Sequence, residues 1–133
     1  MNRPNLQRMA DYIRTVHTEK FNMYSYREGN HSVEFLSPEC NTVGCVIGHC
    51  TILDIDNLPK NKDGSGTILF ASWSETFTGL DVMSTEWDWC FSYYWSFVDN
   101  TPSGAARRIE YLLKNGVPEN FSKHSIKNGS WTY

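Results

Sequence analysis

Residues 101–118 read TPSGAARRIEYLLKNGVP, and they carry the signals that begin and end a helix. Thr101 is a preferred N-cap type, and Pro102 suits the first helical position, where a missing N–H costs nothing. Gly116 provides the stop. The apolar residues between these signals recur at three- and four-residue steps: Ala105, Ile109, Leu112 and Leu113. The pattern predicts a helix that begins at Pro102 and ends before Gly116.

The rest of the chain also shows helical periodicity more often than strand periodicity. A helix over about 4–17 is predicted because its apolar residues recur at three- and four-residue steps: Leu6, Met9, Ala10, Ile13 and Val16. Shorter helices are predicted after Thr42 as N-cap, and from a capping pair at Ser72 and Glu75 up to Gly79. SVEFL at 32–36 is a short strand candidate. The predicted fold class is mainly α, with four to five short helices and at most a minor β-hairpin.

The segment EWDWCFSYYWSFVDN, residues 86–100, fits two periods. Its aromatic residues alternate as in a strand, and a subset also lies on one helical face. We expect a helix over roughly 84–92, with Thr85 and Asp88 as a capping pair, followed by a bend. The alternative of a strand remains open.

The length of 133 residues, of which 40% are apolar, fits one domain. We place a globular helical domain at 1–118 and a C-terminal tail at 119–133, whose candidates for docking are Phe121, Ile126 and Trp131. No apolar run is long enough to span a bilayer, and the first residues do not resemble a secretion signal. A protein of the host cytosol is therefore expected, with its cysteines reduced.

Charge is unevenly distributed along a chain whose net charge is -3. Residues 54–99 hold eight acidic residues against Lys60 and Lys62, whereas residues 105–127 hold five basic residues against Glu110 and Glu119. The basic part is too small to predict binding to duplex nucleic acid. A small anionic ligand needs only two or three positive groups, so it stays compatible with the sequence.

The segment ECNTVGCVIGHC, residues 39–50, gathers three of the four cysteines. A structural zinc would take Cys40, Cys45 and His49, with Cys90 as a distant fourth ligand, but the spacing lacks a tight two-residue knuckle. A catalytic thiol would be Cys40 or Cys45, with a histidine as base. The favoured interpretation is that these residues pack in the core, with His49 hydrogen-bonded to backbone. We expect no metal and no cofactor.

The aromatic residues between Phe70 and Phe97 are too many to be buried together, so some are expected on the surface. Exposed rings beside two arginines would suit stacking on a nucleotide-like ligand or anchoring a protein partner. The predicted binding residues are Trp87, Trp89, Tyr94, Trp95, Arg107 and Arg108.

Two segments carry a resemblance. CNTVGCVIGHC and WDWCFSYYWSFVDNTPSGAARRIEYLLKNGVPE resemble a family of small uncharacterised phage and prophage proteins. That family pairs a Cys-Gly-Thr-x-x-Cys-x-x-Gly-His element with a Trp-x-x-x-Asp-Asn-Thr-Pro-x-x-Ala-x-x-Arg-Ile element, and Asn41 here replaces the usual Gly. The resemblance implies a phage origin and a host-cytosol setting, and no chemistry.

These observations lead to one main hypothesis and two alternatives. The main hypothesis is a phage-encoded, non-enzymatic accessory protein that binds a host protein or a small anionic, nucleotide-like signalling molecule and counters a host response. The first alternative is a Cys/His-dependent or zinc-assisted enzyme centred on Cys40, Cys45 and His49. The second is a structural protein whose aromatic surface closes a homo-oligomer.

Overall fold

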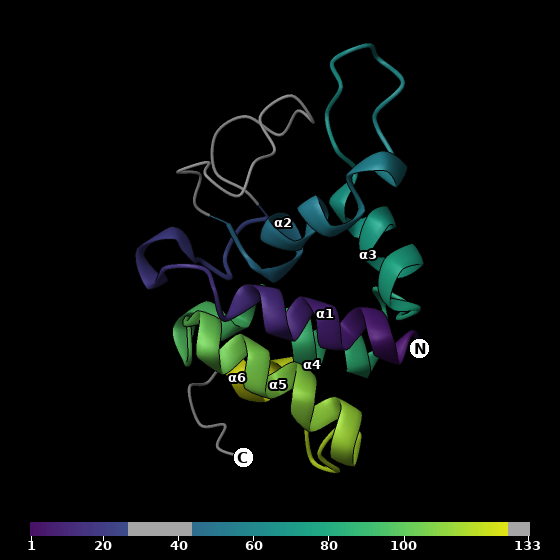
Figure 1. Ribbon diagram of the computed structural model, residues 1–133. Coiled ribbons are helices and arrows are strands. Elements are labelled where there is room, and N and C mark those ends of the chain that lie inside the picture. The colour runs from purple at the N-terminus through teal and green to yellow at the C-terminus, as the bar shows by residue number, and fades with distance from the viewer. Residues whose placement is uncertain (27–43, 128–133) are drawn as a thin grey trace.

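The computed structural model describes residues 1–26 and 44–127, excluding the side chains of Lys123 and Lys127 (Figure 1). The predicted strand at 32–36, the cap at Thr42 and the docking residue Trp131 lie outside this part of the chain. The described elements are α1 (Arg3–Ile13), η1 (Thr18–Lys20), α2 (Val46–Cys50), η3 (Thr51–Asn57), α3 (Phe70–Thr78), α4 (Thr85–Phe91), η4 (Tyr93–Phe97), α5 (Pro102–Asn115) and α6 (Lys123–Lys127), where η marks a 3₁₀ helix.

The prediction of a mainly helical single domain is confirmed, because these helices surround one hydrophobic core. Six α-helices are described, more than the four to five expected, since α2 and α6 are short helices of five residues. In place of a hairpin, the described residues contain two isolated β-bridges, Phe21 with Gly44 and Lys60 with Ile68.

Helix α1 lies at the centre of the domain and contacts α5 on one side and α2 and α3 on the other (Figure 1). Its buried face is Leu6, Met9, Ala10 and Ile13, as the periodicity predicted. The helix ends at Ile13 rather than near 17, because the chain turns there with bonds from Thr15 N to the Tyr12 carbonyl and from Val16 N to the Ile13 carbonyl.

Helix α5 follows the prediction closely. The Thr101 hydroxyl accepts a hydrogen bond from Gly104 N at 3.0 Å, and Gly116 N donates to the Leu112 carbonyl at 2.9 Å. Gly116 has a φ of 75°, which glycine adopts without a steric penalty. Local signals were therefore sufficient for both ends of this helix.

Helices α3 and α4 confirm the predicted segments but correct their caps. Helix α3 starts at Phe70, so Ser72 lies inside it; the residue before the helix is Leu69, whose N donates to the Pro59 carbonyl at 2.9 Å. Gly79, with a φ of 71°, ends it as predicted. Helix α4 is capped by Ser84, whose hydroxyl accepts from Trp87 N at 3.1 Å, and not by Thr85.

The C-terminal segment packs on the aromatic part of the core. Phe121 and Ile126 are both buried, and the Phe121 ring lies 5.0 Å from the ring of Trp89 and 6.0 Å from that of Trp95. Helix α6 contacts η4 and α4. The two described residues named as docking candidates therefore contribute to the core.

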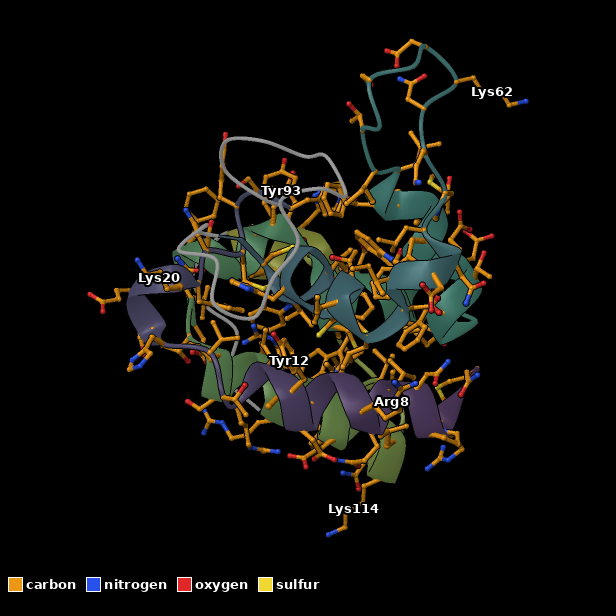
Figure 2. All side chains as sticks on the ribbon, turned by 45° about the horizontal axis from the view of Figure 1, so that its top comes forward. Arg8, Tyr12, Lys20, Lys62, Tyr93 and Lys114 are labelled. Atoms are coloured by element: carbon orange, nitrogen blue, oxygen red, sulfur yellow. The ribbon has the colours of Figure 1, made fainter. Side chains whose placement is uncertain are left out.

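The surface carries a projecting loop between η3 and α3, with Lys62 near its tip, while Lys114 extends into solvent at the opposite end of the molecule (Figure 2). Within residues 1–26 and 44–127, none of the helices has the length and apolar character that crossing a membrane requires.

Candidate functional site

Three of the six predicted binding residues lie in the core and not on a surface. Trp89, Trp95 and Arg108 are each fully buried. Trp95 Nε1 donates to the Trp89 carbonyl at 2.9 Å, and Trp89 Nε1 donates to the Arg108 carbonyl at 2.8 Å. The Arg108 guanidinium lies over the Trp95 ring, 4.3 Å from its centroid. The expectation that these side chains are exposed is wrong, because the two indoles pack against each other and against Phe121.

The two predicted arginines hold the start of α5. Arg107 and Arg108 both approach Asp99 Oδ2, at 3.2 Å and 3.5 Å, while the Thr101 hydroxyl donates to Asp99 Oδ1 at 2.7 Å. Asp99 therefore joins the turn before the helix to its second turn. Arg107 is exposed and Arg108 is buried, so they do not form the paired anion site that the sequence suggested.

The cysteine segment folds differently from the prediction. Helix α2 begins at Val46, so Cys45 is its N-cap residue and does not share a helical face with His49. His49 Nε2 donates to the Lys20 carbonyl at 2.6 Å, which confirms a hydrogen bond to backbone. Cys40 lies outside the described residues. Among those described, no group of three His, Cys, Asp or Glu side chains is placed to hold a metal ion.

The described thiols are buried and protonated at neutral pH. Burial raises the pKa of Cys45 to about 11, although amide N–H groups of Gly48 and Ile47 act in the opposite direction. Burial also raises the pKa of Cys50 and of Cys90. A nucleophilic thiol needs a depressed pKa, so this environment does not favour the thiol mechanism at these three positions.

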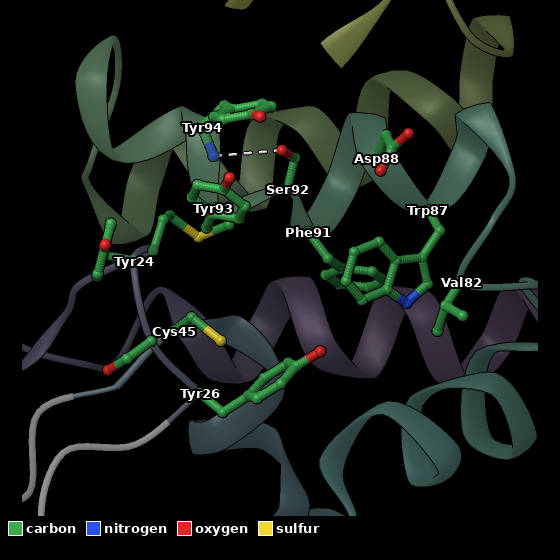
Figure 3. A pocket seen from close by; sticks show the side chains of 12 residues that line it. Tyr24, Tyr26, Cys45, Val82, Trp87, Asp88, Phe91, Ser92, Tyr93 and Tyr94 are labelled. Carbon is green, nitrogen blue, oxygen red and sulfur yellow. Dashed lines mark hydrogen bonds between the residues drawn. The ribbon is translucent and has the colours of Figure 1, made fainter. Parts of the chain in front are cut away.

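A cavity of about 440 Å³ opens between the start of α2 and the α4–η4 segment (Figure 3). We call it the aromatic pocket. Its described lining is Met23, Tyr24, Ser25, Tyr26, Cys45, Val82, Trp87, Asp88, Phe91, Ser92, Tyr93 and Tyr94. Two predicted residues, Trp87 and Tyr94, therefore meet at one site, together with four aromatic residues that were not predicted.

Five of the six rings of the pocket form two groups, and the sixth, Tyr26, stacks on Phe70. Figure 3 shows one group at the η4 end and the other at the α4 end beside Val82. In the first group, the centroid of the Tyr93 ring lies 4.3 Å from the centroid of the Tyr94 ring and 5.8 Å from that of the Tyr24 ring. In the second, the Trp87 and Phe91 rings are 5.6 Å apart with an edge-on geometry. The pocket therefore presents aromatic surface at both ends.

Hydrogen bonds fix the elements that carry these rings. Trp87 Nε1 donates to the Ser74 hydroxyl at 3.0 Å, which joins α4 to α3. The Ser92 hydroxyl accepts from Tyr94 N at 3.2 Å and caps η4, as the dashed line in Figure 3 shows. The rings are therefore held by capped helices and by a hydrogen bond between α4 and α3.

The opposite wall, residues 22–26, is irregular backbone that is held by side-chain and backbone contacts. Met23 N donates to Asn100 Oδ1 at 2.7 Å, and Cys45 N donates to the carbonyls of Ser25 and Tyr26 at 3.0 Å and 3.3 Å. These bonds position Tyr24 and Tyr26 although neither residue lies in a helix.

The polar groups of the pocket are mostly neutral hydroxyls. Burial raises the pKa of Tyr26, with a smaller contribution from Cys45. A hydrogen bond with the Tyr94 hydroxyl, more than burial, raises the pKa of Tyr93. The only charged side chain in the described lining is Asp88, and Lys, Arg and His are missing from this set of residues.

Met23, Tyr24 and Tyr26, which form one wall, were not among the predicted binding residues. The available signal was the pair of tyrosines in NMYSY, residues 22–26, which lie in a stretch without helical periodicity. Binding residues are often carried by loops that a rigid scaffold positions, and this segment fits that description. Because these residues are far from α4 in the sequence, the sequence alone does not indicate that the two segments line one pocket.

The chain was compared with family models, with curated protein sequences and with solved structures, and none of the three comparisons gave a match.

Proposed function

We propose that this protein is a non-enzymatic, phage-encoded accessory protein that binds a small host molecule in the aromatic pocket and thereby counters a host response. The observation that carries the proposal is the pocket itself, with six aromatic side chains converging on about 440 Å³. The phage setting rests on the resemblance of the CNTVGCVIGHC and WDWCFSYYWSF segments.

The pocket has the properties expected of a ligand site. Small-molecule sites commonly measure about 300–1,000 Å³ and combine apolar walls with a few polar groups that orient the ligand. Here the rings supply the apolar walls, and Ser25, Ser92 and the tyrosine hydroxyls supply the polar groups. Rings held by Ser74 and Ser92 are ordered before the ligand arrives, which lowers the entropic cost of binding.

The chemistry of the described lining supports binding more than catalysis. The Cys45 thiol is protonated at neutral pH, and the pKa values of Tyr26 and Tyr93 are raised, so these groups are poor nucleophiles and poor bases. Acid–base catalysis at neutral pH uses groups whose pKa lies close to that pH. The alternative of a Cys/His-dependent or zinc-assisted enzyme depends on Cys40, which lies outside the described residues.

The test is native mass spectrometry on protein equilibrated with a small-molecule extract of the host cell and then desalted. The wild type should retain an added mass. Val82→Trp fills the pocket and should abolish retention, whereas Met83→Trp, the same change at an 86% exposed position next to it, should not. If the wild type retains no mass, or Val82→Trp retains as much as the wild type, the proposal fails.

A second candidate function is capture of a host protein, and a separate observation favours it. Tyr24, Tyr93 and Phe97 are large, substantially exposed aromatic residues, and together with Tyr94 they line a shallow depression beside the pocket. Interface hot spots are often clustered aromatic residues. Phe97→Lys should abolish co-purification of a host protein while leaving small-molecule retention unchanged. If this patch instead forms a homo-oligomer, light scattering should give the wild type a molar mass above that of one chain, and Phe97→Lys should return the mass to that of one chain.

A further inference from the structure

Two helices fix the position of Tyr26 in the wall of the aromatic pocket. Cys45 N, at the start of α2, donates to the Tyr26 carbonyl at 3.3 Å, and a Cβ atom at Gly48 would stand 1.5 Å from that carbonyl oxygen. The ring of Phe70, the first residue of α3, stacks on the Tyr26 ring with centroids 5.4 Å apart and planes 18° apart. Both the backbone and one ring face of Tyr26 are therefore held before a ligand arrives, which lowers the entropic cost of binding.

The Tyr26 side chain also points into the pocket. Figure 3 shows it entering from the side of α2, with its hydroxyl directed toward Phe91 and Trp87. The centroids of those two rings are 5.6 Å apart and their planes meet at 65°. Two rings in this arrangement form a corner, in which a flat aromatic ligand contacts the face of one ring and the edge of the other. The Tyr26 hydroxyl is directed at this corner.

Other polar groups around the pocket are already bonded to the protein. Trp87 Nε1 donates to the Ser74 hydroxyl at 3.0 Å, and the Ser92 hydroxyl accepts from Tyr94 N at 3.2 Å. The Tyr93 hydroxyl is hydrogen-bonded to that of Tyr94. A ligand that pairs with these groups competes with bonds that the fold itself makes.

The Tyr26 hydroxyl acts on a ligand as a hydrogen-bond donor. Burial raises its pKa above the ordinary value of 10.0, so the phenol keeps its proton at neutral pH. The matching group on a ligand is an acceptor. A carbonyl oxygen accepts hydrogen bonds near the plane of its substituents. A flat molecule with a carbonyl on its edge can therefore keep its faces against the rings while its edge accepts from the hydroxyl.

From this geometry we infer that the ligand of the aromatic pocket is a flat aromatic molecule with a carbonyl oxygen on its edge, and that the Tyr26 hydroxyl orients it by donating to that oxygen. The inference rests on the proposed function, because it names the class of molecule that the same pocket takes. Tyr26 is then a specificity-determining residue. It distinguishes a carbonyl compound from a hydrocarbon of the same shape, whereas the surrounding rings bind both.

The test is a double-mutant cycle with two probes of nearly the same shape: acetophenone, which carries a carbonyl oxygen, and α-methylstyrene, which has a methylene group in its place. Binding of each probe to the full chain is measured by NMR titration at neutral pH. Tyr26→Phe removes the hydroxyl and keeps the ring that stacks on Phe70. The ratio of acetophenone to α-methylstyrene affinity should fall about three- to ten-fold in this variant. The difference in hydration between the probes is the same for both proteins, so the change in the ratio isolates the hydrogen bond.

Tyr12→Phe is the matched control, because Tyr12 in α1 is also partly buried and lies outside the described lining of the pocket. Its affinity ratio should equal that of the wild type. A second measurement needs no variant: in the wild-type complex, the acetophenone methyl protons should show nuclear Overhauser contacts with the Tyr26 ring and none with the Tyr12 ring. A ratio that Tyr26→Phe leaves unchanged, or the lack of contacts with Tyr26, would overturn the inference.

The outcomes separate this inference from the proposed function. Val82→Trp should abolish binding of both probes, because it fills the pocket. If it does so while Tyr26→Phe leaves the ratio unchanged, the role of Tyr26 fails and the binding pocket stands. If both probes are silent while the Val82-sensitive host mass persists, the ligand class fails alone. Probe binding that Val82→Trp leaves intact places the probes outside the pocket and overturns the inference. Silence of the probes together with the lack of a retained host mass removes both proposals.

Discussion

At the scale of single residues, Cys45 shows how position decides reactivity. It is the N-cap of α2, where amide N–H groups favour a thiolate, and it also lines the aromatic pocket. Yet it is only 3% exposed, and burial outweighs the amides, so its pKa rises from 9.0 to about 11. The same position with more solvent would be a reactive one.

We therefore predict slow alkylation of Cys45. The rise in pKa lowers the thiolate fraction at neutral pH about 100-fold relative to an ordinary thiol. Modification by iodoacetamide, followed by peptide mass spectrometry, should accelerate about ten-fold per pH unit up to about 11. Because the folded pKa is the higher one, the stability that this thiol contributes is complete below pH 9 and declines as the pH rises from 9 to about 11.

The same chain in guanidinium is the control, where Cys45 should react as an ordinary thiol. If native Cys45 reacts at pH 7.5 as fast as the denatured thiol, the thiol is activated and the enzyme alternative regains its support.

At the scale of elements, α2 packs against residues 22–26, the segment that forms the pocket wall opposite α4 and η4. Gly48 lies in α2 directly against the Tyr26 backbone, and a Cβ atom built at Gly48 would stand 1.5 Å from the Tyr26 carbonyl oxygen. Only glycine allows this approach. Gly44 and Gly48 are four residues apart in the sequence, a spacing that is compatible with a close backbone neighbour but does not identify Tyr26 as that neighbour.

Gly48→Ala should therefore destabilise the protein, although the same change in an open helix stabilises it. We expect a loss of about 1 to 3 kcal/mol, because Tyr26 must move. Urea denaturation measures it, with Ser103→Ala, an exposed change in the first turn of α5, as a control that stays within about 0.5 kcal/mol. An unchanged midpoint for Gly48→Ala would show that the two segments do not touch in solution.

Element boundaries differ in how far local sequence determines them. Thr101 and Gly116 bracket α5 with chemistry that acts within four residues, so the sequence predicted both ends. Helix α3 begins at Phe70 without a side-chain cap, directly after the bridge between Lys60 and Ile68. The predicted cap at Ser72 was wrong because a capping pair is only a local preference, and here the backbone is already helical two residues before Ser72.

At the scale of the whole molecule, the aromatic residues divide between core and pocket. Composition predicted correctly that not all of them are buried, since Tyr93 and Phe97 are exposed. Composition could not assign individual rings to the core or to the surface, because the aromatic residues of segment 86–100 fit both the strand period and the helical period. Burial of Trp89 and Trp95 depends on Phe121, which lies more than twenty residues away. Of the six aromatic residues that line the pocket, only Trp87 and Tyr94 were predicted as binding residues, since Tyr24 and Tyr26 meet α4 through contacts that are distant in sequence.

Trp95→Ala should consequently act on folding and not selectively on binding. It removes a fully buried indole that contacts Trp89, Phe121 and Arg108, so the free energy of unfolding should fall by about 3 to 5 kcal/mol. Phe97→Ala, a change at an exposed ring in the same 3₁₀ helix, should cost less than about 0.5 kcal/mol. Thermal unfolding followed by circular dichroism compares them. Equal stabilities would mean that Trp95 is not in the core.

Main-chain hydrogen bonds hold residues 20–26 against residues 44 and 45. Asn22 N donates to the Gly44 carbonyl, Gly44 N donates to the Lys20 carbonyl, and Cys45 N donates to the carbonyls of Ser25 and Tyr26. Every donor and acceptor in this set is a backbone atom, so a side-chain replacement other than proline leaves the bonding groups in place. A pocket wall that is fixed through its backbone can therefore change the side chains it presents to a ligand without losing these bonds.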